Sequence, residues 1–265
     1  MKIGCCVNMV SEDAYAIGYE RLPMLKEFGF DYAELPLAQL CAVEKPVLGE
    51  IKAMLRDLDL NCETCNNFIP ASVRITGAEA DPSRVDEYVR RAMDVMAEVG
   101  ASTVVFGSSG AKNVPEGFPR DKAYGQIVDT LQRVSRIIEP YGVTAAIEPI
   151  NRLESNIILT AAEGKKLAED VNCENIRLLV DWYHMAMENE GTGIIGEAKD
   201  LLRHVHFAVT AERRFPRAGD DITGILGALK AAGYDRRISI EAYSNDFAND
   251  APAALEYMRK VWAEV

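Results

Sequence analysis

Acidic residues and a histidine stand at the ends of apolar, strand-like runs in the second half of the chain. The run Ala145-Ala146-Ile147, bounded by Gly142 and Pro149, ends in Glu148. A carboxylate at the end of a buried strand is costly unless it is paired or holds a metal ion. Three later runs end alike, in Leu-Leu-Val-Asp181, His204-Val-His206 and Ile-Ser-Ile-Glu241. Glu148 therefore needs a partner, and these strand ends supply candidates.

Side-chain alternation predicts that the strand-end groups face the same way. Ala146 and Glu148 share a face of their strand, as do Leu179 and Asp181 in theirs. If all these faces point inward, three carboxylates and an imidazole meet, and carboxylates pressed together repel one another unless a cation compensates them. Oxygen-rich ligation with a single nitrogen suits Mn²⁺ or Mg²⁺ better than structural zinc, and Co²⁺ is a plausible substitute. We expect one divalent cation held by Glu148, Asp181, Glu241 and an imidazole of His204-Val-His206.

The elements that must position these groups follow a repeating pattern, a short apolar run and then an amphipathic helical stretch. The expected strands are Lys2–Asn8, Tyr32–Leu35, Asn61–Asn66, Thr103–Gly107, Val143–Glu148, Ile176–Asp181, His204–Val209 and Ile238–Glu241. The expected helices include Ala14–Phe28, Arg84–Val99, Lys122–Tyr141, Ala161–Val171, Ile222–Ala232 and Ala251–Val265.

Glycines mark the ends of several expected helices and support this division. The pairs Phe28-Gly29, Val99-Gly100, Tyr141-Gly142 and Ala232-Gly233 each put glycine where a left-handed cap residue would sit. Strands that alternate with helices in this way are typical of an α/β fold, the (β/α)8 TIM barrel, whose site lies at the carboxyl ends of the strands. A doubly wound open sheet competes, but no Gly-x-Gly-x-x-Gly turn follows the first strand. We expect a single domain over residues 1–265.

Composition restricts the partners. The 265 residues are 48% hydrophobic and 26% charged, as in ordinary soluble globular chains, and the net charge of -12 opposes attraction to nucleic acid or anionic membranes. No apolar stretch is long enough to span a membrane and the amino terminus lacks the plan of a signal peptide, so we expect a cytoplasmic protein with a small polar ligand. The six cysteines, Cys62-Glu-Thr-Cys65 included, are interpreted mainly as packed thiols.

The strand-end motifs carry a resemblance to a known superfamily. The stretches "IEPINRLESN", "LLVDWYHM", "RHVHFAVTAERRFPRAGDD" and "RISIEAYSNDF" resemble the sugar isomerase and epimerase superfamily with the xylose isomerase-like TIM barrel, most closely its ketose 3-epimerase branch. The resemblance covers essentially the whole chain. It implies that Glu148, Asp181, His206 and Glu241 ligate one divalent cation, typically Mn²⁺, Mg²⁺ or Co²⁺, with Mn²⁺ favoured.

The resemblance also implies a reaction and a set of substrate contacts. Glu148 and Glu241 would exchange protons at C3 of a ketose on opposite faces, while the metal holds the C2 oxygen and stabilises the enediolate. Glu154, His184 and Arg213 match positions that contact the sugar; they could equally be a solvated loop carboxylate, a helix-capping histidine and a surface arginine. For His204, one layer below His206, we expect a hydrogen-bonded packing role.

Two loops leave the state of the sugar open. Family members commonly have Pro-Gly-x-Gly after the aromatic residue, whereas this chain has Pro216-Arg217-Ala218-Gly219. Together with the stretch "GSSGAKN", Gly107 to Asn113, Arg217 could favour a phosphate group. The glycines and serines could equally serve only to let the loop turn tightly. The partner is therefore a sugar or a sugar phosphate.

Other functions in the same superfamily compete with epimerisation. Endonucleases acting at abasic DNA sites use three zinc ions and many histidines, whereas this chain has only His184, His204 and His206. The residues leave several other functions open: aldose-ketose isomerisation, hydroxypyruvate isomerisation, an inosose dehydratase-like lyase reaction, C-glycoside cleavage by one subunit of a complex, and sugar binding without turnover. Tyr257 and Trp262 on the last helix could belong to the core or to a subunit contact of a homo-oligomer.

Overall fold

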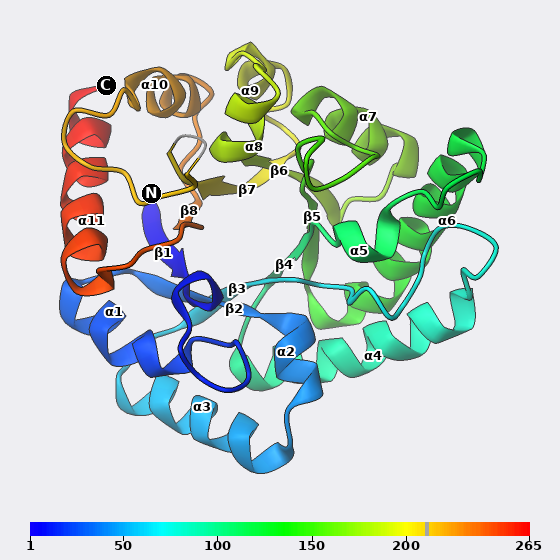
Figure 1. The fold of residues 1–265 in the computed structure, drawn as a ribbon, viewed down its shortest axis with the longest axis horizontal. Helices are drawn as coiled ribbons and strands as arrows, with labels where there is room; N and C mark the ends of the chain where they lie inside the picture. The colour runs from blue at the N-terminus through cyan, green and yellow to red at the C-terminus, as the bar shows by residue number, and fades with distance from the viewer. Residues whose placement is uncertain (210–211) are drawn as a thin grey trace.

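Eight parallel strands close into a barrel in the order of the sequence. The computed structural model describes residues 1–209 and 212–265, and each strand pairs with the next until β8 pairs with β1. Figure 1 shows the strands at the centre and the helices around them. The strands are β1 (Lys2–Cys6), β2 (Tyr32–Pro36), β3 (Cys62–Asn66), β4 (Thr103–Phe106), β5 (Thr144–Ile147), β6 (Ile176–Asp181), β7 (Leu202–Phe207) and β8 (Arg237–Ile240). The predicted TIM barrel is confirmed.

Helices cover the outside of the barrel, and short ones follow several strands directly. The α-helices are α1 (Leu22–Phe28), α2 (Leu37–Ala42), α3 (Lys45–Asp57), α4 (Pro82–Val99), α5 (Ser109–Lys112), α6 (Arg120–Ile138), α7 (Ala161–Val171), α8 (Trp182–Met187), α9 (Gly193–Glu197), α10 (Thr223–Ala231) and α11 (Phe247–Glu264). Turns of 3-10 helix, η1 (Val7–Val10), η2 (Tyr19–Arg21) and η3 (Glu139–Tyr141), extend some of these segments.

The helix expected over Ala14–Phe28 begins later, at Leu22, and that part of the prediction was wrong. The Asp13 carboxylate accepts hydrogen bonds from the backbone N–H groups of Tyr15 and Ile17, at 2.7 and 3.0 Å, and holds the preceding segment in a turn. Gly18 then adopts a φ of 83°, which is incompatible with a right-handed α-helix at this residue. A local side chain to backbone network thus replaces the expected first turns.

The glycine stop signals are confirmed. Gly29, Gly100, Gly142 and Gly233 have φ values of 83°, 83°, 65° and 72°, in the left-handed region that glycine adopts without steric cost. Each glycine closes the helical segment before a strand, so the chain re-enters the barrel within a few residues. Together with the helix starts, such as Asp81 capping α4, they fix the lengths of the helical segments.

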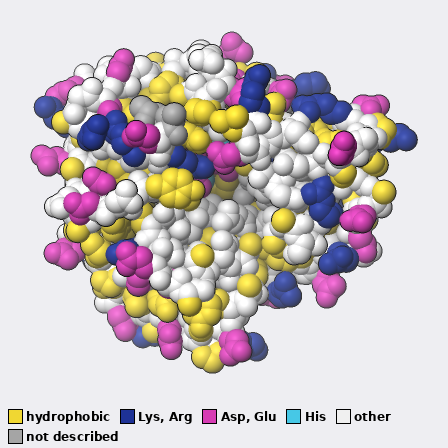
Figure 2. Space-filling view, viewed as in Figure 1, with side chains coloured by type: hydrophobic (Ala, Val, Ile, Leu, Met, Phe, Trp, Pro, Cys, Tyr) yellow, Lys and Arg dark blue, Asp and Glu magenta, His cyan; other side chains and the backbone are white. Residues whose placement is uncertain are grey.

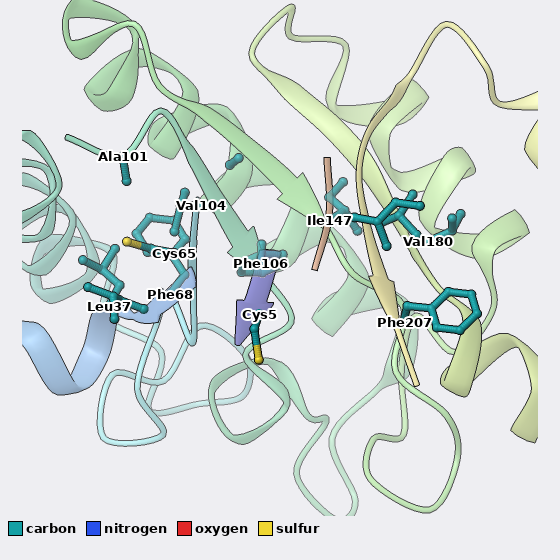
Figure 3. Packing of buried hydrophobic residues seen from close by; sticks show 14 of the residues in the cluster. Cys5, Leu37, Cys65, Phe68, Ala101, Val104, Phe106, Ile147, Val180 and Phe207 are labelled. Carbon is teal, nitrogen blue, oxygen red and sulfur yellow. The ribbon is translucent and has the colours of Figure 1, made fainter. Parts of the chain in front are cut away.

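The core has two layers, one on each side of the strands. The outer layer lies between strands and helices and includes Val104, Phe106, Val180 and Phe207, which Figure 3 shows among their neighbours. The inner layer is small and consists of Val105, Ala146 and Leu179. Inside the barrel these apolar side chains are accompanied by buried polar ones, among them Glu34 and His204.

The amino-terminal end of the barrel carries an ion pair cluster. The side chains of Lys2 and Arg237 both donate to the Glu63 carboxylate. Burial raises the pKa of Glu63, but the hydrogen bonds from Lys2 and Arg237 outweigh it and lower the pKa below its usual value. Within residues 1–209 and 212–265, no helix combines the length and apolar character needed to cross a membrane.

Candidate metal and sugar site

The four predicted ligands meet at the carboxyl ends of β5 to β8. Glu148 and Glu241 are the first residues beyond β5 and β8, and their backbone N–H groups donate to the carbonyls of Phe106, at 3.1 Å, and Phe207, at 3.0 Å. Asp181 is the last residue of β6, and it pairs in register with His206, the last residue but one of β7. One ligand atom from each of the four lies within 4.8 Å of the others. The structure thus brings together the four side chains that alternation along the strands predicted to converge.

The cluster is buried and held by contacts through the imidazole. His206 Nδ1 lies 2.9 Å from Glu148 Oε1 and 3.3 Å from Glu241 Oε2. None of the four residues is more than 7% exposed. Burial lowers the pKa of His206, yet Glu34 and Glu241 outweigh it and raise the pKa well above the ordinary histidine value.

The carboxylates differ in how firmly they hold a proton. Burial, with the charge of Glu241, raises the pKa of Glu148. Burial also raises the pKa of Asp181. For Glu241, burial is outweighed by Arg213 and His206, which lower the pKa to about 2. The cluster therefore pairs a carboxyl that retains a proton more readily with one that stays ionised.

The residues present fit a divalent cation. Asp181 Oδ1 accepts from the backbone N–H of Tyr183 at 2.8 Å, whereas Oδ2 is buried without a hydrogen-bond partner among the described residues. An orphaned buried carboxylate oxygen is unfavourable unless a cation compensates it. Three carboxylates and one imidazole form a donor set of the kind that Mn²⁺ and Mg²⁺ accept.

The three further predicted residues lie beside the cluster. His184, on α8, has Nε2 3.5 Å from Asp181 Oδ2, and its Nδ1 lies 2.7 Å from Asn151 Nδ2. Glu154 is on the loop after β5, with a side chain that is 40% exposed. Its carboxylate lies 3.5 Å from Arg213 Nη1, so the structure brings these residues together as one wall of the site.

Arg213 is the cation of that wall. It donates to Glu241, lies 3.6 Å from Asp181 Oδ2, and stacks over the Tyr183 ring with 4.8 Å to the centroid. Its backbone φ of 47° is in the left-handed region, which is uncommon for a residue with a side chain. The motif that contains it also includes Thr210 and Ala211, which lie outside the described residues.

A cavity of about 520 Å³ opens above the cluster. One side carries Glu148, Glu154, His184, Arg213 and Glu241. The other side comes from the segments after β1 to β4 and is lined by Asn8, Met9, Ala38, Gln39, Ala42, Asn66, Asn67, Ile69, Pro70, Ala71, Gly107, Ser108, Ser109 and Gly110. Figure 2 shows that the middle of the face seen there is mainly uncharged. Amides and hydroxyls thus face the clustered carboxylates, His184 and Arg213 across the cavity.

The stretch Gly107 to Asn113 contributes its first four residues to the cavity lining. Ser108 has a φ of 40°, and α5 begins at the next residue, so the chain does turn tightly here. Lys112 is buried, and its Nζ donates to the carbonyls of Gly107 and Glu148. Burial lowers the pKa of Lys112 to about 8. Arg217 is exposed and is not among the described residues that line the cavity.

The sequence reasoning passed over two buried charged residues near the site, Lys112 and Glu34. Lys112 stands in a polar loop, where no periodic pattern marks it. Glu34 lies inside the expected strand Tyr32–Leu35, and the rule that singled out Glu148, that a buried strand carboxylate needs a partner, would have found it. One partner of Glu34 is His204, whose Nε2 lies 2.8 Å from Glu34 Oε2. His204 thus has the hydrogen-bonded packing role that we expected for it.

Known proteins similar to this chain include several sugar epimerases. The chain is 28% identical to the L-ribulose 3-epimerase of Mesorhizobium japonicum over 250 residues, covering 90% of this chain and 80% of that protein. It is 26% identical to the ketose 3-epimerase of Arthrobacter globiformis, covering 100% and 91%. A crystal structure of the D-allulose 3-epimerase from Methylomonas sp. superposes with a TM-score of 0.87 at 25% identity, covering 98% of each chain.

The family itself is shown by a match over most of the chain. Residues 22–261 match the family described as xylose isomerase-like TIM barrel, a range that runs from α1 into α11 and includes all the predicted site residues. The closed eight-stranded barrel agrees with that description. This chain therefore belongs to the xylose isomerase-like TIM barrel family.

Proposed function

We propose that residues 1–265 act as one domain that epimerises a ketose at C3, with a divalent cation, Mn²⁺ for preference, as cofactor. The observation that carries this proposal is the pair Glu148 and Glu241, two glutamates from different strands that share one buried cluster with an imidazole between them. The relatives named L-ribulose 3-epimerase and ketose 3-epimerase support the reaction type.

The cation would be held by Glu148, Asp181, His206 and Glu241. When bound, it would supply positive charge beside the sugar carbonyl and so favour loss of the neighbouring proton. The orphaned Oδ2 of Asp181 and the mutual repulsion of the carboxylates support this assignment.

The protein's own groups would move the proton. One glutamate takes the C3 proton of the ketose, the electron pair of that C–H bond forms a C2–C3 double bond, and the C2 oxygen gains the charge. The second glutamate, starting protonated, gives its proton to the opposite face of C3, and the C2 carbonyl is restored. At the end of the reaction the two carboxyl groups have exchanged their protonation states.

The surroundings of the two glutamates support one pair of starting roles. Arg213 lowers the pKa of Glu241, which favours Glu241 as the base for one epimer, and burial raises the pKa of Glu148, which favours Glu148 as the acid. The reverse reaction exchanges these roles. Arg213, His184 and Glu154 would orient the substrate, because they line the cavity beside the two glutamates.

The cavity lining favours an unphosphorylated sugar. Arg213 is the sole cationic side chain among the described residues that line it, and the neighbouring carboxylates already occupy its donors. A phosphate group would need charge-assisted donors of its own. The amides of Asn8, Gln39, Asn66 and Asn67 suit sugar hydroxyls instead.

The test is proton exchange in D₂O. Protein loaded with Mn²⁺ is incubated with free and phosphorylated ketoses, freed of the ion and followed by NMR, together with Glu148→Gln, Glu241→Gln and the exposed-surface control Glu98→Gln. We expect deuterium at C3 and the C3 epimer with free ketoses, lost in both site variants and kept in the control. Exchange at C1 instead would show an aldose-ketose isomerase, and no exchange in metal-loaded protein would refute the proposal.

A further inference from the structure

A second buried carboxylate lies beneath the site and contacts one of its residues directly. Glu34, on β2, is fully buried, and its Oε1 lies 2.9 Å from Nε2 of His206. The two nitrogens of His206 thus face different groups, because Nδ1 points to Glu148 and Glu241. Only one of them can offer a lone pair to a cation while the other keeps a proton.

We propose that Glu34 is a positioning residue, which accepts the hydrogen bond of His206 Nε2–H and thereby keeps that proton on Nε2 and the Nδ1 atom aimed at the cation. The inference rests on the proposed metal site. A histidine that ligates a metal generally donates its other N–H to a carboxylate or carbonyl, which fixes the tautomer and the ring plane. Here the distance, the burial and the direction of both nitrogens agree with that arrangement.

Glu34 is itself fixed by its other partners. A register shift places Thr64 opposite Glu34, where Thr64 Oγ1 donates to Glu34 Oε2 at 2.6 Å. Ser239 Oγ donates to the same oxygen, and the Tyr32 hydroxyl lies 2.7 Å from Ser239 Oγ. His204 Nε2 lies 2.8 Å from Oε2. Oε2 is thus held by three groups from three other strands, which leaves Oε1 for His206.

The network extends to the first strand through packing. A Cβ on Gly4 would overlap the ring of Tyr32, so only glycine leaves room for this tyrosine inside the barrel. Tyr32 is fully buried, and its hydroxyl is the end of the hydrogen-bonded chain. The orientation of His206 therefore depends on residues from β1, β2, β3, β7 and β8.

A different use of the same atoms competes with this inference. Cys6, Glu34 and His206 form a second group that could hold a cation, and Cys6 Sγ lies 3.8 Å from His206 Nε2. In that arrangement Nε2 would be a ligand and carry no proton. The hydrogen-bond distance from Nε2 to Glu34 favours the positioning role, and the number of cations bound per chain decides between the two.

The first experiment measures Mn²⁺ affinity by titration calorimetry and counts ions per chain in the native protein, Glu34→Ala, Glu34→Gln and Thr64→Val, each checked for folding by circular dichroism. We expect Glu34→Ala to bind Mn²⁺ about 10 to 100 times more weakly, and Glu34→Gln, which keeps one acceptor oxygen, to lie between it and the native protein. Thr64→Val, which removes one of the groups that hold Glu34 Oε2 and leaves Oε1 to His206, should weaken Mn²⁺ binding less than Glu34→Ala does.

The second measurement needs no variant at Glu34 and covers the case in which its substitutions do not fold. The chain has three histidines, so ¹⁵N–¹H spectra of Mg²⁺-loaded native protein can be assigned with His184→Gln and His204→Gln. We expect His206 to carry its proton on Nε2. A proton on Nδ1, two ions per chain, or equal Mn²⁺ affinity in Glu34→Ala would overturn the inference. Failure of the native chain to bind Mn²⁺ would overturn the proposed metal site as well.

Discussion

Gly107 borders the site so closely that adding one methyl group should displace the Glu148 carboxylate, one of the two groups proposed to move the proton. A Cβ at this position would come well inside 3.0 Å of Glu148 Oε2, closer than real Cβ atoms approach other atoms, and within 3.4 Å of its Cδ and 3.2 Å of Ile150 Cδ1. Glu148 is enclosed by His206 on its other side, at 2.9 Å. In Gly107→Ala the carboxylate must therefore move away from the position at which it would meet C3.

The size of the effect follows from that movement. Restoring an ordinary contact requires a shift of the order of 1 Å, and a misplacement of that size in a reacting group costs about 100-fold in rate. This corresponds to about 2.7 kcal/mol of transition-state stabilisation. We expect kcat/KM for the ketose substrate identified by D₂O exchange to fall about 100-fold, measured by following epimer formation with Mn²⁺ at saturation.

A matched glycine provides the control. Gly125, on α6, has no atom within 4 Å of an added Cβ, so Gly125→Ala should leave kcat/KM unchanged. It should also stabilise the fold by about 0.5–1 kcal/mol, because alanine is the better helix former. If folded Gly107→Ala turned over at the native rate, the conclusion that Glu148 must occupy its present position during the reaction would be refuted.

Three further predictions concern charge. Asp181→Asn should keep the N-terminal cap of α8, because Asn and Asp cap helices equally well. It should lose the rise in Tm that Mn²⁺ gives the native chain, which corresponds to about 2.7 kcal/mol of added stability at a Mn²⁺ concentration of 100 times Kd. Glu63→Gln should have a lower free energy of unfolding than the native chain at pH 7. This difference in free energy should vanish as the pH falls below 4.5 and through the lowered folded-state pKa of Glu63, and urea unfolding at several pH values measures it. Arg213→Gln should raise the pKa of Glu241 and move the acid limb of the kcat/KM profile to higher pH; an unmoved limb would contradict that pairing.

The barrel and the clustering of the site could be predicted because both depend on regular alternation. Residues two apart on a strand share a face, and parallel strands in a closed barrel all end at one mouth, so Glu148, Asp181, His206 and Glu241 had to meet once the strands were placed. The glycine caps could be predicted as well, because each depends only on the helix that it ends. These features do not depend on contacts between residues far apart in the sequence.

What escaped prediction depends on irregular local contacts and on partners far along the chain. The segment before α1 has helical composition, but the Asp13 carboxylate binds its N–H groups in a turn. Glu34 has the right signal, yet its meaning depends on His204 and His206, about 170 residues away in sequence. The charge balance that gives Glu241 and Glu148 opposite pKa shifts likewise depends on where Arg213 lies in space.

The two sides of the cavity are built by different halves of the barrel, and this bears on how such a protein can diverge. The four clustered residues stand at the carboxyl ends of β5 to β8 with a ligand atom of each within 4.8 Å of the others, so a change in one disturbs the rest. The opposite side comes from the carboxyl ends of β1 to β4 and the segments that follow them, which carry Asn8, Gln39, Asn66 and Ser108. Substitutions of these four residues can alter which sugar fits without replacing the groups proposed to react. Variation in substrate among relatives should therefore concentrate in the first half of the sequence, while the second half conserves the chemistry.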